Sequence, residues 1–287
     1  MKTHPGRTPA ELVWTLFQIE HTKNIGLRLD KITTCRNLIP LAIDYPALAS
    51  GSPRHLSAQF ITECATALRF AMFGTRGKPV EANELAAKAT RFVINGRPMR
   101  ILWDIEHDVR DLDGKRVLGV CEHDPDEPDA VMISISGPRL ASRPATLRST
   151  AVHELAHAIF DMPEALDSRA RKIIRTVVEE RRPAKGRKID WPEWRVGVFM
   201  GAFIVPLDRL ANAVARQAGA MDMPFRWRSG PNGLPMPSIA GDRDADMIDC
   251  LVESLAESFG VSPAFMAVRL KKGGFVAPHV ITFEGRA

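Results

Sequence analysis

The chain has 287 residues and a mass of 31.7 kDa, with 45% hydrophobic and 25% charged residues. This composition supplies enough apolar mass for a packed core and excludes a disordered chain, a collagen and a long coiled coil. The longest apolar stretch, 196–205, is about half of the roughly 20 residues that cross a bilayer. Residues 1–17 carry no signal-peptide pattern, so we expect a cytoplasmic protein with no membrane partner.

The cysteines also favour a reducing compartment. The four of them, Cys35, Cys64, Cys121 and Cys250, lie far apart in the sequence and form no CxxC pair. Neither a disulfide framework nor a zinc site built from thiolates is therefore expected.

The net charge of +5 is concentrated in one segment. Residues 169–188 contain nine basic and two acidic side chains, a local charge of +7, which leaves −2 for the rest of the chain. A run of this kind is usually a solvated helix face or an insertion. Contact with nucleic acid or another acidic partner is the alternative reading.

Capping and breaking residues predict a mostly helical beginning. Helices are expected over 9–21, 57–73 and 80–92, each with apolar residues at helical spacing and a Gly, Asn or polar boundary. We therefore expect a helical N-terminal region over 1–78.

The pattern then changes to short apolar runs separated by turn residues. Strands are predicted over 99–105, 117–121 and 131–136, and three antiparallel strands are the simplest arrangement. Start signals at Ser142 and Pro144 then predict a helix over 145–160.

This last helix contains the sequence His153-Glu154-Leu155-Ala156-His157, an HExxH motif. Residues four apart share one face of a helix, so His153 and His157 can bind one Zn²⁺, and Glu154 lies beside the metal as general base. Two packed or solvated histidines on a surface helix are the alternative. The strand-then-helix context favours the metal site.

A catalytic zinc needs a third protein ligand, and no third histidine follows closely. Glu193 opens an apolar helix over 192–205 and lies on its apolar stripe, where a carboxylate must be paired or bound to metal. An interaction with the helix dipole explains Glu193 nearly as well. The downstream carboxylates considered as third ligand are Asp161, Glu164, Glu179, Glu180 and Glu193.

Two segments follow this helix. Residues 226–237 are rich in Pro and Gly and are expected to form a loop. Two helices over 247–259 and 263–270 resemble a DNA-reading helix-turn-helix in spacing, but their residues are mostly apolar. A packed helical hairpin is therefore favoured.

Together these residues resemble the ImmA/IrrE-type metallo-endopeptidases over about 80–275. That family combines a strand, HELxH, a helix beginning E-W and ending in Pro, and a C-terminal helix pair. The corresponding segments here are 131–136, His153 to His157, Glu193-Trp194 through Phe199 to Pro206, and 255–270. Val196-Gly197 stands where the family usually has Ala-Asn.

The resemblance implies an α+β fold with a small antiparallel sheet packed on the HExxH helix and further helices at both termini. It implies a zincin-like domain over 79–276, interrupted by a basic insertion over 168–190 and followed by a tail over 277–287. It also implies that Glu193 is the third ligand of one Zn²⁺ per chain.

By the same resemblance the substrate is a protein, expected to be a helix-turn-helix transcriptional repressor or another regulator. An extended substrate is expected to pair with the strand 131–136 by β-augmentation. The alternative function is a non-proteolytic, zinc-containing regulator that binds DNA or a partner protein through its basic segment. Side chains that could stabilise an oxyanion, if the fold brings one close, are His107, His123, Arg148 and Arg195, whereas the only tyrosine, Tyr45, falls in the N-terminal part that is expected to be helical.

Overall fold

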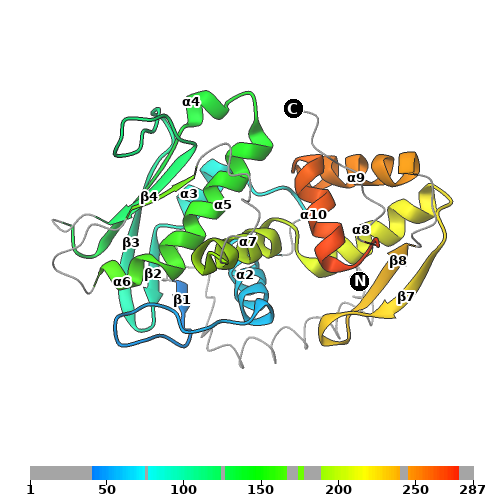
Figure 1. The fold of residues 1–287 in the computed structure, drawn as a ribbon, viewed down its shortest axis with the longest axis horizontal. Coiled ribbons are helices and arrows are strands. Elements are labelled where there is room, and N and C mark those ends of the chain that lie inside the picture. Colours follow the sequence, from blue (N-terminus) through cyan, green and yellow to red (C-terminus); the bar gives the residue numbers. More distant parts are fainter. Residues whose placement is uncertain are drawn as a thin grey trace, which may run out of the picture.

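The computed structural model describes residues 41–74, 77–123, 127–166, 174–177, 189–239 and 245–277. They form a mixed sheet and a set of helices, in line with the α+β expectation (Figure 1). The helix predicted over 9–21 lies outside the described residues.

The main sheet is mixed rather than antiparallel, and the described residues contribute six strands to it. Its order is β1-β2-β3-β5-β4-β6. β3 runs parallel to β5, and β4 pairs antiparallel with β5 on the other side, so the prediction of three purely antiparallel strands was wrong. After β3 the chain first forms β4, two positions away in the sheet, and then forms β5 in the position between them. The strands are β1 (Leu41–Ile43), β2 (Arg91–Ile94), β3 (Arg97–Asp104), β4 (Gly119–His123), β5 (Ala130–Ile135) and β6 (Ile174–Val177).

Two of these strands contradict the predicted elements directly. The helix expected over 80–92 is only α3 (Ala82–Lys88), and the chain then enters β2. Asn95 and Gly96, at φ 50° and 78°, connect β2 to β3 in a left-handed turn of the kind that favours hairpins. β1 falls in the region expected to be helical and pairs parallel with β2.

The helices predicted over 57–73, 145–160, 192–205, 247–259 and 263–270 lie close to their observed bounds, whereas the helix Leu207–Ala220 was not predicted. Ser57 caps α2 by accepting a hydrogen bond from the Phe60 amide, and Gly74, at φ 62°, follows the last turn. The remaining helices include α8, which connects α7 to the C-terminal part, and the short α4 and α6. The helices are α2 (Ala58–Phe73), α4 (Gly137–Leu140), α5 (Pro144–Phe160), α6 (Met162–Ala165), α7 (Trp191–Ile204), α8 (Leu207–Ala220), α9 (Ala245–Phe259) and α10 (Pro263–Gly273).

The segment predicted as a loop is instead a hairpin. β7 (Phe225–Ser229) pairs antiparallel with β8 (Pro235–Ile239) around a short 3-10 turn. Prolines are tolerated in β8 because a two-stranded ribbon has only edge strands. Beyond it, α9 and α10 pack against each other, and α10 buries Met266 and Leu270, in line with the expected packed hairpin.

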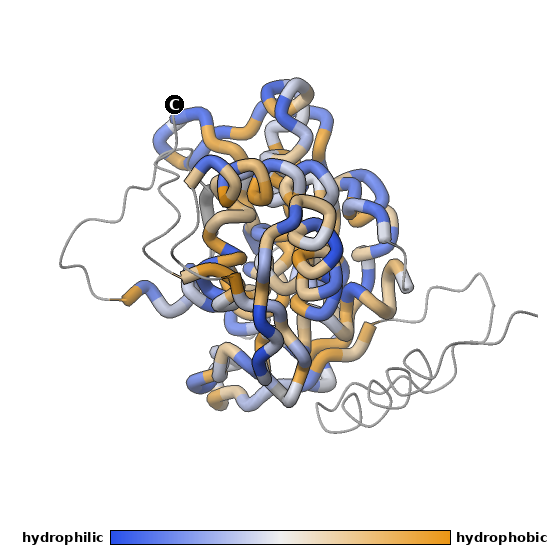
Figure 2. The backbone as a smooth tube through the Cα atoms, turned by 90° about the vertical axis from the view of Figure 1, so that its right-hand side faces the viewer, coloured by the Kyte–Doolittle hydropathy of each residue, from blue (hydrophilic) through white to orange (hydrophobic). Residues whose placement is uncertain are grey.

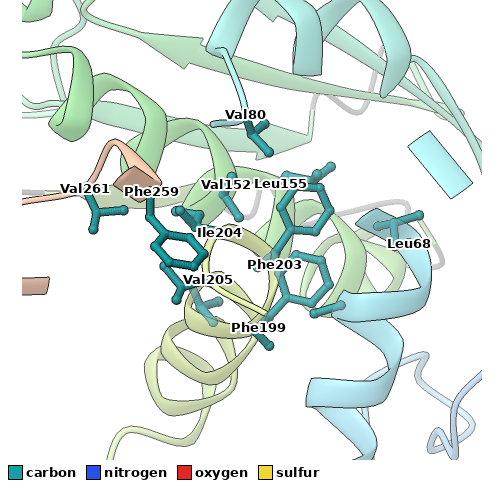
Figure 3. Close-up of a cluster of buried hydrophobic side chains, with 14 of the residues drawn as sticks. Leu68, Val80, Val152, Leu155, Phe199, Phe203, Ile204, Val205, Phe259 and Val261 are labelled. Carbon is teal, nitrogen blue, oxygen red and sulfur yellow. The ribbon is translucent and has the colours of Figure 1, made fainter. Parts of the chain in front are cut away.

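The core lies on the face of the sheet that α5 covers, where α5, α7 and α2 meet. α5 covers β4 and β5, α7 packs on α5, and α2 packs on α7 (Figure 1). Figure 3 shows buried side chains from all three helices and from the α9–α10 connection interlocking in this region. Figure 2 shows hydrophobic stretches running through the middle of the molecule.

Within the described part of the chain, no helix by itself has the length and hydropathy to cross a membrane. Two sharply bent helix pairs, α7–α8 and α9–α10, reach that threshold only when each pair is taken together.

Candidate metal centre

The HExxH motif lies in the middle of α5, the helix that is packed on both sides. Buried apolar residues on either side of the motif, including Val152 and Leu155, fix the helix between the sheet and α7. Glu154 and His157 have no exposed surface, while the His153 side chain remains 15% exposed. The motif is therefore held rigidly, with His153 closest to solvent.

Glu193 comes from the first turn of α7. Asp190 caps this helix by accepting a hydrogen bond from the Glu193 amide at 3.4 Å. Farther along the same helix, Phe199 packs edge-on against Phe160 of α5, with ring centroids 5.7 Å apart. The cap and this contact position the Glu193 carboxylate opposite the motif.

The three side chains point their ligand atoms at one another. Glu193 Oε1 is 3.5 Å from His157 Nε2, and Glu193 Oε2 is 3.6 Å from His153 Nε2. The two Nε2 atoms are 3.0 Å apart. Each of the three residues offers one potential ligand atom, and these three atoms lie within 4.8 Å of one another. The three residues could together hold a metal ion.

The donor set and its spacing fit a small divalent cation. Two ligands bonded at about 2.1 Å in a tetrahedral site are about 3.4 Å apart, close to the separations found here. Two imidazole nitrogens at 3.0 Å without a shared cation or proton would face each other with their lone pairs. A bound cation would satisfy both nitrogens and the carboxylate.

Glu154 lies beside this cluster as a buried carboxylate. Neither of its oxygens has a hydrogen-bond partner among the described residues. Burial raises the pKa of Glu154 to about 8; the neighbouring His157 opposes this rise and the Glu193 carboxylate adds to it. Because a carboxylate without hydrogen-bond partners is costly to bury, Glu154 is a candidate functional residue.

The space for Glu154 depends on a glycine in β4. A Cβ on Gly119 would lie 2.7 Å from Glu154 Oε1 and 2.8 Å from Thr150 Cγ2. Any other residue at this position would push the carboxylate away from its place.

Gly119→Ala is accordingly expected to lower the free energy of unfolding by about 1–3 kcal/mol, the usual cost of overpacking. Gly197→Ala, in α7, is the matched control because an added Cβ there meets nothing within 4 Å. It is expected to raise stability by about 0.5–1 kcal/mol, as alanine favours a helix. Urea unfolding of both variants checks this, and equal stabilities would contradict the close packing at Gly119.

Asp161, which follows α5, was considered as the third metal ligand, but its carboxylate contacts the far side of the His157 ring. Its Oδ2 is 2.6 Å from His157 Nδ1, on the side of the ring away from the ligand atoms, and its Oδ1 is 2.9 Å from Arg195 Nη2. Burial alone would lower the pKa of His157, but hydrogen bonds with Asp161 and Glu193 outweigh it, and the pKa rises to about 9. Asp161 thus contacts a ligand and does not join the cluster.

Of the remaining carboxylates considered as third ligand, the structure describes only Glu164. Glu164 lies in α6 and, among the described residues, takes no part in a group of metal-ligating side chains. Glu179 and Glu180 lie outside the described residues.

The only tyrosine, Tyr45, and the candidate oxyanion donor Arg148 both hydrogen-bond to backbone carbonyls in the core. The Tyr45 hydroxyl donates to the Ile159 carbonyl at 2.9 Å, and burial raises the pKa of Tyr45. Arg148 donates to the carbonyls of Val80 and Gly260.

Of the other three candidates, two have a carboxylate partner. His107 is exposed and lies 2.9 Å from Asp104, and Arg195 pairs with Asp161. His123 is buried at the end of β4, and neither of its ring nitrogens has a hydrogen-bond partner among the described residues.

Sequence reasoning missed the roles of Asp161 and Gly119. The signal for Asp161 was present, because it follows His157 by four residues and so shares its helix face. Gly119 carried no local signal, since its role depends on the packing of β4 against α5.

A comparison with protein-family models found no match, and neither did comparisons with curated protein sequences and with solved structures. The function of this chain must therefore be inferred from its own residues and their arrangement.

Proposed function

We propose that this chain is a zinc-dependent endopeptidase that hydrolyses a peptide bond in a protein substrate. The observation that carries the proposal is the convergence of His153, His157 and Glu193 beside the buried carboxylate of Glu154. Two histidines and one glutamate are a known ligand set of catalytic zinc, whereas structural zinc sites usually have four protein ligands. Three ligands leave one position for water or substrate.

The chemistry divides between the metal and Glu154. Zinc held by the three ligands would supply Lewis acidity, which polarises a carbonyl and lowers the pKa of water. Glu154 accepts the proton of the water that attacks the peptide carbonyl and passes it to the departing amine. No described residue competes for its oxygens by hydrogen bonding, so the carboxylate is available for both transfers.

The resemblance to ImmA/IrrE-type peptidases supports a helix-turn-helix transcriptional repressor as substrate and the cytoplasm as the place of action. The test is to incubate the zinc-loaded chain with a panel of such repressors and to identify cleavage products by mass spectrometry. Cleavage that stops with a chelator and returns with zinc is expected. A zinc-loaded chain that cuts no member of the panel would count against this substrate class.

The alternative, a DNA-binding regulator, depends on the basic segment 169–188. Only 174–177 of that segment belong to the described residues, and no contact among the described residues favours this function. DNA affinity that falls steeply with salt would favour this function over the peptidase. That affinity should then be lost on neutralising Arg181, Arg182, Arg187 and Lys188.

The strand expected to receive the substrate cannot do so. β5 is paired on both edges, with β3 and with β4, so 131–136 offers no free edge for β-augmentation. β4 is the strand beside Glu154, and its outer edge is paired with β6, with Val177 opposite Gly119. An extended peptide that reaches Glu154 along the sheet must therefore displace β6.

A disulfide across these strands tests the displacement. Arg175 lies directly opposite the native Cys121, and residues paired in this way are close enough for a disulfide. Oxidised Arg175→Cys is expected to lose cleavage of a substrate found in the repressor panel and to regain it on reduction. Cys121→Ser/Arg175→Cys is the control. Unchanged cleavage by the oxidised variant, with the disulfide verified by mass spectrometry, would show that β6 need not move.

A further inference from the structure

Asp161 connects the two helices that supply the proposed metal ligands. It directly follows α5, four residues after His157, and its side chain is buried. One carboxylate oxygen contacts His157 Nδ1 at 2.6 Å, and the other contacts Arg195 Nη2 at 2.9 Å. Arg195 lies in α7, two residues after Glu193. A single buried carboxylate therefore bridges the helix of His157 to the helix of Glu193.

The contact with His157 determines which ring nitrogen is free. A carboxylate accepts hydrogen bonds, so Nδ1 of His157 carries the hydrogen and donates it to Asp161. The lone pair of the neutral ring then lies on Nε2, the atom that faces Glu193 Oε1 and His153 Nε2. Asp161 thus selects the tautomer in which His157 can bind a metal through Nε2.

The contact with Arg195 has two consequences. It compensates the charge of a carboxylate that would otherwise be costly to bury. It also fixes the first turn of α7 against the end of α5, and Glu193 lies in that turn. Tyr45 supports the same end of α5, because its hydroxyl donates to the Ile159 carbonyl and its ring packs against Phe160.

We propose that Asp161 and Arg195 are a positioning pair, which sets the tautomer of His157 and the place of Glu193 without touching the metal. This inference rests on the proposed function, since it assumes that the three ligands hold zinc. It makes zinc affinity depend on an arginine that is not a ligand and whose side chain carries the same charge sign as the metal. Simple electrostatics would instead predict that removing this arginine strengthens zinc binding.

The test is the zinc dissociation constant, measured by chelator competition at one fixed pH, together with the melting temperature of each metal-free variant. Asp161→Asn and Arg195→Met are each expected to weaken zinc binding by about 10- to 100-fold, the usual effect of removing a residue that orients a ligand. The double variant is expected to be little worse than either single one, because the two residues act as a unit. Arg195→Lys, which keeps the charge, is expected to recover part of the affinity.

Arg269→Met is the matched control. Arg269 is also partly buried and donates to the Val205 carbonyl at the other end of α7, far along the helix from Glu193. It is expected to lower the melting temperature while leaving zinc affinity unchanged. Wild-type zinc affinity in folded Arg195→Met, or an equal loss in Arg269→Met, would overturn the pair. A wild-type chain that binds no zinc would instead overturn the proposed function itself.

Discussion

Glu154→Gln is expected to lower the rate of substrate cleavage by about 10²- to 10⁴-fold, the usual contribution of a general base, while zinc content stays at the wild-type level. Glutamine has nearly the same shape as glutamate, so it fits the space that Gly119 leaves beside α5. It cannot accept the proton of the attacking water. Because Glu154 is not among the three ligands, metal binding should not require its charge.

The measurement pairs cleavage rates with zinc content for wild type and variant. Glu164→Gln is the matched control, because Glu164 is a partly buried glutamate just beyond the end of the motif helix and lies outside the cluster. It should retain full activity. Wild-type cleavage by folded, zinc-loaded Glu154→Gln would remove Glu154 from the mechanism and require another base.

The centre illustrates which parts of a site local sequence can predict. His153, Glu154 and His157 lie on one helix, so the helical period alone places their side chains relative to one another. Glu193 lies on a different helix, and the residues by themselves left it undecided between a ligand and a helix-dipole interaction. Its approach to the histidines depends on the packing of α7 against α5, which no local pattern contains.

The arrangement of the strands could be predicted from local sequence even less than the metal centre could. Turn residues predicted strands near β3, β4 and β5, but strand order is a long-range property, and β5 lies between two strands that precede it. The residues of β2 continue an apolar run that also fits a helix. Pairing with β1 and β3 decides that they form a strand.

The basic segment gives a further example. Its charge predicted a solvated insertion or a binding surface, yet four of its residues form β6 on the edge of β4. Charge patterns carry information about solubility and partners and little about which backbone edge a segment will pair with. The pairing of β6 beside Glu154 could be found only in three dimensions.

Glu193→Ala is expected to abolish stoichiometric zinc binding, whereas wild type binds one zinc per chain. Removing Glu193 leaves two imidazoles, and catalytic zinc sites keep three protein ligands. The variant should also lose the stabilisation that zinc gives to wild type. A ligand that binds only the folded state raises the free energy of unfolding by about 2.7 kcal/mol at a concentration 100 times its dissociation constant. A chelator should therefore lower the melting temperature of wild type and leave that of Glu193→Ala unchanged.

Asp190→Ala separates the ligand from the helix cap that positions it. Asp190 accepts the hydrogen bond of the Glu193 amide, so its loss should destabilise α7 by about 0.5–2 kcal/mol while the three ligand side chains remain. Zinc should still bind to this variant, more weakly than to wild type. If Glu193→Ala retained one zinc per chain with wild-type affinity, Glu193 would not be a ligand, and its place at the start of α7 would reflect the helix dipole alone.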